Sequence, residues 1–178
     1  MKALILVGST RQGRKTIHAA EYAAEAFRDS GHTTELFDLE KRDIPFMQER
    51  RRYLEDVPED IEVFGEKVEE CDVLIIVSPE YNHSFPGVLK NALDYLYPEY
   101  HGKPFAYITT SGGGFGGVRG LSHLHDFTLA VNAHPGPNLP VSNIGSVFNE
   151  EGGLEDEDYR SRFSDYVEKV EDHVEKVS

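Results

Sequence analysis

The sequence lacks tryptophan and long apolar runs, and it holds a single cysteine among 178 residues. Cys71 has no partner for an internal disulfide, and because it sits beside an apolar run we interpret it as a small packed side chain rather than a catalytic thiol. No run of about twenty apolar residues occurs, so no transmembrane helix is expected. The N-terminus enters a strand pattern directly, without the charged and apolar segments of a secretory signal, which makes a cytoplasmic location the expectation.

Basic residues are few: 18 Lys and Arg stand against 32 Asp and Glu, giving a formal net charge of −14. This charge argues against nucleic acid and anionic membranes as partners. The acidic residues are spread along the expected helix surfaces and loops, a composition that suits solubility at high ionic strength. A saline host is one explanation, although an ordinary acidic protein would have the same composition.

Apolar runs and helical patterns alternate over one expected domain, residues 1–178, which at 39% hydrophobic content is long enough for one well-buried core. Strands are expected over 3–7, 33–38, 72–77, 104–109 and 139–144, and helices over about 14–30, 60–70, 86–96, 118–132 and 159–177. Repeated strand–helix units predict a three-layer α/β fold whose doubly wound, five-stranded parallel sheet has the order 2-1-3-4-5. Ligands of such folds bind at the carboxyl ends of the first and third strands.

The segment 41–58 is irregular and carries several arginines around an apolar core at 44–47. Loops of this length inside a compact domain are usually functional or interfacial. We interpret this segment as a subunit contact or the rim of an active site rather than as disorder.

The loop after the first strand, from Gly8 to Thr16, carries hydroxyl and basic side chains immediately before a helix. Free backbone N–H groups and the positive end of the helix dipole favour an anion at such a place. The two glycines, Gly8 and Gly13, fit neither a Gly-x-Gly-x-x-Gly fingerprint nor a loop of the Gly-x-x-x-x-Gly-Lys-Ser/Thr type. A single phosphate monoester is therefore the expected ligand, with a solvated turn as the alternative on this loop alone.

Two further loops follow the third and fourth strands. One reads Ser78-Pro79-Glu80-Tyr81-Asn82-His83-Ser84-Phe85-Pro86-Gly87, and the other reads Thr110-Ser111-Gly112-Gly113-Gly114-Phe115-Gly116-Gly117. The glycines of the latter let the backbone come close to a flat or anionic ligand. Because the carboxyl ends of parallel strands share one edge of a sheet, all three loops are expected to converge.

Together the three loops resemble those of the NAD(P)H-dependent FMN reductase family, which includes flavin, quinone, azo-dye and chromate reductases. The most specific part is Pro79-Glu80-Tyr81-Asn82, followed by Ser84-Phe85-Pro86-Gly87-Val88-Leu89-Lys90-Asn91-Ala92-Leu93-Asp94. The resemblance covers nearly the whole chain. It implies a flavodoxin-like fold, bound FMN, and a homodimer or homotetramer.

The resemblance also implies roles for residues of each loop. Ser9, Arg11 and Thr16 would hold the FMN phosphate, with Lys15 or Arg14 as an additional cation. Pro79, Glu80, Tyr81 and Asn82 would lie against the isoalloxazine ring, mainly through main-chain atoms, whereas Ser111, Gly112, Gly113 and Gly114 would close over the ring edge and the ribityl chain. The alternatives are that Glu80 is an ordinary solvated carboxylate and that Tyr81 is a core aromatic.

No side chain is assigned a catalytic role, because the cofactor would carry the chemistry. His123-x-His125 lacks the spacing and the companions of a metal site, and no Gly-x-Ser-x-Gly elbow surrounds Ser111. On this resemblance we expect an oxidoreductase in which NADPH or NADH reduces bound FMN and a flavin, quinone or similar small molecule reoxidises it in a ping-pong cycle. The alternatives are a flavodoxin-type electron carrier, against which Arg11 argues, and a domain without flavin that acts as an interaction module.

Overall fold

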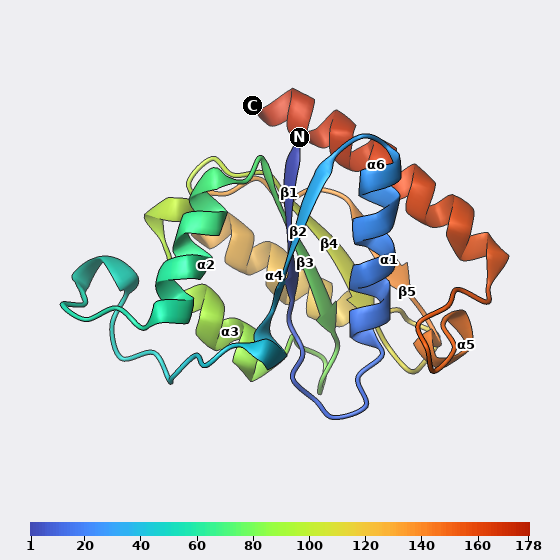
Figure 1. Cartoon of the computed structure of the whole chain (residues 1–178), viewed down its shortest axis with the longest axis horizontal. Coiled ribbons are helices and arrows are strands. Elements are labelled where there is room, and N and C mark those ends of the chain that lie inside the picture. The colour runs from blue at the N-terminus through green and yellow to red at the C-terminus, as the bar shows by residue number, and fades with distance from the viewer.

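The computed structural model describes all 178 residues, with a parallel sheet between two layers of helices (Figure 1). The strands are β1 Lys2–Val7, β2 Thr33–Asp38, β3 Val73–Pro79, β4 Phe105–Thr110 and β5 Asn138–Val141. They lie in the order β2-β1-β3-β4-β5, and every neighbouring pair is parallel. The predicted flavodoxin-like topology is therefore confirmed.

Helices cover both faces of this sheet. They are α1 Thr16–Asp29, α2 Glu59–Glu70, α3 Gly87–Asp94, α4 Val118–Ala130, α5 Ile144–Val147 and α6 Glu157–Val177, with 3₁₀ turns η1 Leu39–Lys41, η2 Arg51–Tyr53 and η3 Pro98–Tyr100. The helices α1 and α6 pack on one face, and α2, α3 and α4 pack on the other. This is the predicted three-layer arrangement.

The three central strands β1, β3 and β4 each contribute to two cores, because successive side chains of a strand point to opposite faces of the sheet. In β1, Ala3, Ile5 and Val7 belong to the cluster under α1 and α6, whereas Leu4 and Leu6 belong to the cluster under α2, α3 and α4. Burial on both faces explains why β1 and β3 read as continuous apolar runs rather than as alternating ones.

The fifth strand is shorter than predicted. It ends at Val141, and the expected continuation to Ile144 is instead a turn that leads into the one-turn helix α5. Asn143, with φ of 48°, takes the chain out of the extended conformation. Ile144 then donates its backbone N–H to the Ser111 carbonyl at 3.0 Å, which ties this turn to the loop after β4.

The irregular segment 41–58 is attached to α3. Asn91 accepts a hydrogen bond from the Met47 backbone N–H at 2.9 Å and donates one to the Pro45 carbonyl at 2.8 Å. The Tyr95 hydroxyl donates to the same carbonyl at 3.2 Å. Between these anchors Phe46 projects outward with 87% of its surface exposed, so the segment is fixed in place while its aromatic side chain is free for a contact.

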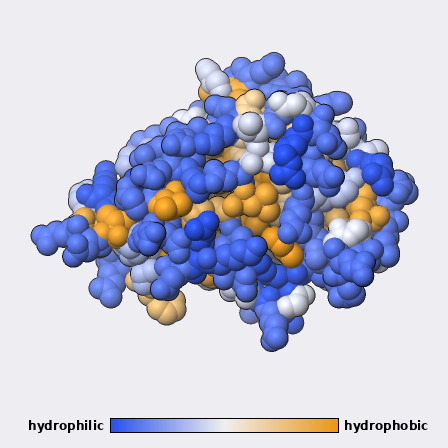
Figure 2. Space-filling model, in the orientation of Figure 1, coloured by the Kyte–Doolittle hydropathy of each residue, from blue (hydrophilic) through white to orange (hydrophobic).

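Polar side chains cover most of the face seen in Figure 2, with small apolar groups between them. None of the helices combines the length and the apolar character that crossing a membrane requires. Cys71 is buried, and burial raises the pKa of its thiol to about 11. The interpretation of this cysteine as a packed side chain is confirmed.

Candidate functional site

The three loops meet where the winding of the sheet reverses, between the carboxyl ends of β1 and β3, at the lower edge of the sheet in Figure 1. Together they surround an open cavity of about 380 Å³. It is lined by Arg11, Gln12, Gly13, Arg14, Lys15, Thr16, Pro79, Glu80, Tyr81, Thr110, Ser111, Gly112, Ile144 and Gly145. The expected convergence of the loops at this edge is confirmed.

Most of the predicted site residues line this cavity. Ser9, Asn82, Gly113 and Gly114 do not. Thr110, Ile144 and Gly145 line it although the sequence did not suggest a role for them. Thr110 directly precedes the predicted Ser111 and carries a hydroxyl at a strand end, so the sequence offered a signal for it. Ile144 lies in the expected strand 139–144 and Gly145 directly follows that strand, so the sequence offered no signal for these two.

Gly8 and Ser9 fix the start of the first loop. A Cβ at Gly8 would lie 2.6 Å from Leu89 Cδ2, so the close approach of this loop to α3 requires glycine. Ser9 is fully buried, and its Oγ lies 3.0 Å from the Tyr81 hydroxyl. This contact joins the first loop to the second.

The basic side chains of the first loop differ in their partners. Arg14 donates to both oxygens of Asp38 at 2.5 and 2.6 Å, and the hydrogen bond raises the pKa of the guanidinium. Lys15 Nζ lies 2.8 Å from a carboxylate oxygen of Glu150. Arg11 is exposed on the cavity wall and makes no ion pair within the chain. Arg11 is therefore the cation of this loop that is available to a ligand.

The N-terminus of α1 opens onto the cavity without a compensating negative charge. Lys15 at the N-cap position makes no capping hydrogen bond, and the first turn contains no acidic residue. By contrast, α2 and α6 carry acids in their first turns. Because the first N–H groups of a helix have no intrahelical partner, this end of α1 favours an anion. Thr16, in the same turn, is buried with its Oγ1 3.1 Å from Thr110 Oγ1.

Glu80 in the second loop acts as a helix cap. One of its carboxylate oxygens accepts hydrogen bonds from the backbone N–H groups of Arg119 and Gly120 at 3.0 and 3.1 Å, at the start of α4. Its own N–H donates to the Thr110 carbonyl at 3.1 Å. With only 12% of its side chain exposed, Glu80 is not the solvated carboxylate of the alternative interpretation. It links the second loop to α4 and to β4.

Tyr81 to Ser84 form a tight turn beside the cavity. The backbones of Tyr81 and Ser84 exchange hydrogen bonds of 2.8 and 3.1 Å. Asn82 and His83, at φ of 50° and 65°, occupy the two left-handed positions of a type I′ turn. Asn82 therefore serves the turn through its backbone, and its exposed side chain lies outside the cavity lining. Tyr81 is half-buried and is not a core aromatic.

The glycines of the third loop fall into two groups. A Cβ at Gly116 would lie 2.7 Å from Pro140 Cβ, and one at Gly117 would lie 3.0 Å from Thr109 Cβ, so packing demands these two. A Cβ at any position from 112 to 114 would meet nothing within 4 Å. Packing within the chain does not explain those three glycines, which leaves a bare stretch of backbone at the cavity rim.

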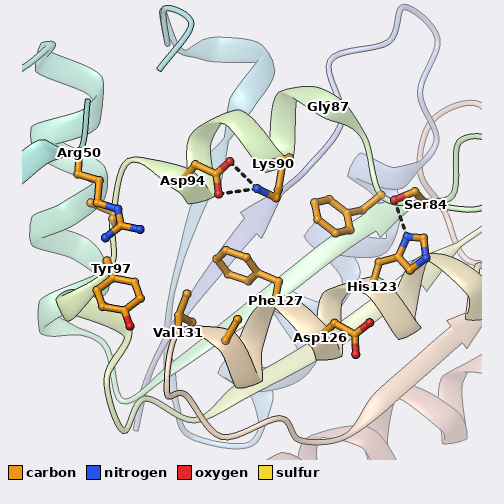
Figure 3. A pocket seen from close by; sticks show the side chains of 13 residues that line it. Arg50, Ser84, Gly87, Lys90, Asp94, Tyr97, His123, Asp126, Phe127 and Val131 are labelled. Atoms are coloured by element: carbon orange, nitrogen blue, oxygen red, sulfur yellow. Dashed lines mark hydrogen bonds and ion pairs between the residues drawn. The ribbon is translucent and has the colours of Figure 1, made fainter. Parts of the chain in front are cut away.

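A larger hollow of about 750 Å³ lies between α3 and α4 and shares no lining residue with the cavity (Figure 3). Its basic groups already have partners: Lys90 pairs with Asp94, and Arg50 lies over the Tyr97 ring at 4.5 Å. His123 Nδ1 lies 2.8 Å from Ser84 Oγ on its other side. This hollow is on the far side of the Tyr81–Ser84 turn and lacks the free cation of the cavity.

The two histidines of the His123-x-His125 pattern point to different surroundings. His125 packs its ring against Tyr107 at a centroid distance of 4.9 Å, whereas His123 contacts Ser84. Burial lowers the pKa of His125. No group of three or more His, Cys, Asp or Glu side chains is placed to hold a metal ion.

Comparison with known proteins finds a consistent set of relatives. Residues 1–144 match the profile of a family described as NADPH-dependent FMN reductase. An NAD(P)H-dependent FMN reductase of Pseudomonas aeruginosa is 34% identical over 166 residues, covering 90% of this chain and 88% of the relative. An NAD(P)H:quinone oxidoreductase of Solanum tuberosum is 31% identical over 168 residues, covering 91% and 87%.

Among solved structures, the flavoenzyme NAD(P)H:(acceptor) oxidoreductase FerB from Paracoccus denitrificans aligns with a TM-score of 0.79 at 25% identity. The alignment covers 99% of this chain and 98% of that one. The likeness thus extends over the sheet, both helical layers and the loops at the carboxyl edge.

Proposed function

The chain belongs to the NADPH-dependent FMN reductase family, and on this premise we propose that it binds FMN in the cavity at the carboxyl edge of the sheet. It is an oxidoreductase with NADPH or NADH as co-substrate. The observation that carries the proposal is the open N-terminus of α1 beside Arg11, the unpaired cation of the cavity. A phosphate monoester satisfies both at once, because it accepts N–H hydrogen bonds and balances the guanidinium charge.

The residues present suit the phosphate end of FMN. Arg11 supplies a charged donor, the first turn of α1 supplies backbone N–H groups, and Thr16 supplies a hydroxyl. Ser9 has its hydroxyl 3.0 Å from that of Tyr81, and beside the predicted contact with phosphate we give it the role of holding the first loop against the second. Arg14, engaged by Asp38, shapes the loop rather than contacting the ligand.

The other two loops suit the flat end of the cofactor. Pro79, Glu80 and Tyr81 line one part of the cavity and Ser111 and Gly112 line another, with the bare backbone of Gly113 and Gly114 directly after them. Backbone without side chains can approach a ring closely and present N–H donors to its polar edge. FMN, when bound, supplies the acceptor for hydride and the carrier of electrons. The chain binds and orients it, and leaves one face of the cavity open.

The open face suits a cycle in which the nicotinamide and the electron acceptor use the same place in turn. We propose a flavin, a quinone or a similar small molecule as the acceptor, in line with the names of the relatives. Such a ping-pong cycle gives parallel lines in double-reciprocal plots of steady-state rates. Converging lines would instead require both substrates to be bound together.

A homodimer or homotetramer in the cytoplasm completes the proposal. The exposed apolar side chains Phe46, Phe115 and Leu129 are 87%, 67% and 61% exposed and are candidates for a contact between copies of the chain. The attachment of segment 41–58 to α3 would let Phe46 reach a neighbouring subunit without reordering the chain. Light scattering of the purified protein measures the assembly directly.

The binding experiment for this proposal uses the protein as purified. The expected result is a yellow protein that releases FMN on denaturation, identified by mass spectrometry, at about one FMN per chain. A colourless protein that takes up no added FMN would contradict the proposal and favour the interaction module.

A further inference from the structure

The segment after α5 forms a small closed turn over the N-terminal end of α1. Asn149 holds it together: its Oδ1 accepts from the N–H groups of Glu151 and Gly153 at 3.0 and 2.8 Å, and its own N–H donates to the Gly153 carbonyl at 3.0 Å. Phe148, directly before it, is fully buried in the core. The turn is therefore anchored at its base and closed by its own hydrogen bonds.

Contact with α1 sets where this turn lies. Gly152, at φ of 88°, packs against the His18 ring so closely that a Cβ there would lie 2.7 Å from Nδ1. His18 itself is largely buried and packs near Phe148, with ring centroids 6.3 Å apart. His18 lies one helical turn after Lys15. The contact between Gly152 and His18 therefore holds the backbone around Glu150 close to Lys15.

Glu150 and Lys15 form an ion pair at the edge of the cavity. Lys15 Nζ lies 2.8 Å from Glu150 Oε1 and 3.4 Å from the Phe148 carbonyl. The Lys15 ammonium lowers the pKa of the Glu150 carboxyl, which keeps it ionised. The lysine side chain is 22% exposed and lines the cavity, whereas the glutamate side chain is 90% exposed and is free to turn into solvent.

This pair means that the first loop carries its own counter-ions. Asp38 and Glu40 lie against Arg14, and Glu150 lies against Lys15. The pair of Arg14 and Asp38 is buried, with side chains 10% and 7% exposed, so separating it would leave two buried charges without partners. The Lys15 pair lies at the surface, where such interactions are weak enough to exchange for a stronger anion. Of these two paired cations, only Lys15 can exchange its carboxylate partner for a ligand without disturbing the loop.

We propose that Glu150 is a displaceable counter-ion of Lys15 that a flavin phosphate replaces on binding, so that Glu150 sets how strongly the site prefers phosphorylated flavin. The inference rests on the proposed function. Before binding, the Glu150 carboxylate neutralises Lys15 and repels incoming anions in an already acidic protein. On binding, the phosphate takes the ammonium and Glu150 turns outward. The Lys15–Glu150 ion pair therefore lowers the affinity for FMN and leaves the affinity for a flavin without phosphate unchanged.

The test titrates FMN and riboflavin into the full-length chain freed of flavin, following flavin fluorescence. Glu150→Gln keeps the size of the side chain and removes its charge. We expect FMN affinity to rise roughly two- to fivefold, the range of a surface ion pair, with riboflavin affinity unchanged. The gain should shrink as salt is raised, since exposed charges are screened.

Glu151→Gln is the matched control, because Glu151 lies in the same turn, changes the net charge equally and makes no ion pair. It should leave FMN affinity within error of the wild type. In a Lys15→Met background, Glu150→Gln should produce no gain, because the coupling between the two residues has been removed. Equal gains for both glutamine variants, or a gain that survives without Lys15, would overturn the inference.

Failure of this inference is distinguishable from failure of the proposed function. If the wild type binds FMN and Glu150→Gln binds it with unchanged affinity, Glu150 is no counter-ion and the flavin site stands. If the wild type and every variant bind neither flavin, the proposed function itself is wrong, and the inference falls with it.

Discussion

Arg14 holds both carboxylate oxygens of Asp38, at 2.5 and 2.6 Å, and the same guanidinium donates to the Ser9 carbonyl at 2.5 Å. Asp38 is the last residue of β2, so this pair ties the strand next to β1 to the loop that follows β1. The loop between β1 and α1 therefore has a defined shape before any ligand arrives. Arg14 therefore holds the loop in position, and in the proposed flavin site the exposed Arg11 is the cation with no partner within the chain.

Removing the charge of Asp38 tests this relationship. Asp38→Asn should destabilise the fold by about 2 kcal/mol, because a nearly buried guanidinium loses a charge-assisted hydrogen bond, and should weaken FMN binding by loosening the loop. Urea unfolding measures the first effect. Glu40→Gln is the control: at 3.6 Å from Arg14 and 51% exposed, Glu40 should contribute less than about 0.5 kcal/mol. Equal stability of the wild type and Asp38→Asn would contradict the role given to Arg14.

Arg11→Ala addresses the contact with phosphate. A hydrogen bond to a charged group contributes about 1.5–3 kcal/mol, so FMN affinity should fall about ten- to a hundredfold. Riboflavin binding and the unfolding midpoint should stay unchanged, because Arg11 is exposed and unpaired. Gln12→Ala, also on the cavity wall, serves as the control. Fluorescence titration that finds FMN affinity unchanged in Arg11→Ala would place the phosphate elsewhere.

Glu80 provides a test of structure rather than of binding chemistry. Glu80→Ala removes the cap from the first turn of α4 and should lower stability by about 1 kcal/mol, the usual cost of a lost N-cap interaction. Glu66→Ala, on the exposed side of α2, should leave the unfolding midpoint nearly unchanged. If Glu80→Ala unfolds at the same urea concentration as the wild type, the two N–H contacts of Glu80 have no net stabilising effect.

The acidic surface leads to a prediction about salt. The chain has a net charge of −14, so its carboxylates repel one another in the folded state, and added salt screens that repulsion. If the surface is adapted to brine, the thermal midpoint should rise as KCl is increased from dilute buffer to molar concentration. A midpoint that does not respond to KCl would speak for an ordinary acidic protein.

The sequence was most informative where a short pattern determines local structure. Continuous apolar runs predicted β1 and β3, and the composition of three loops predicted where the cavity lies. Both predictions succeed because each pattern is formed by residues that are close together in the sequence. Three contacts that shape the site were beyond such reasoning, because they join distant positions. Glu80 caps Arg119 and Gly120 across about forty residues, and Thr16 meets Thr110 across 94.

The same limit applies to charge and to short elements. Sequence reasoning left Lys15 and Arg14 as interchangeable cations, because the partners that separate them, Glu150 and Asp38, lie 135 and 24 residues away. It extended β5 through Ile144, since an apolar residue suits a strand and a helical turn equally. Only the left-handed Asn143 decides between them, and asparagine is frequent in many other conformations.

The most direct test of the central claim is the visible spectrum of the flavin-loaded protein on anaerobic mixing with NADPH or NADH. An oxidoreductase of this family should lose its flavin absorbance without any second protein, and a quinone or free flavin added afterwards should restore it. An electron carrier has no nicotinamide site and should stay yellow with an excess of both nucleotides, although dithionite bleaches it. Bleaching by NADPH or NADH followed by recovery is the predicted result, and a spectrum that only dithionite changes would contradict the account.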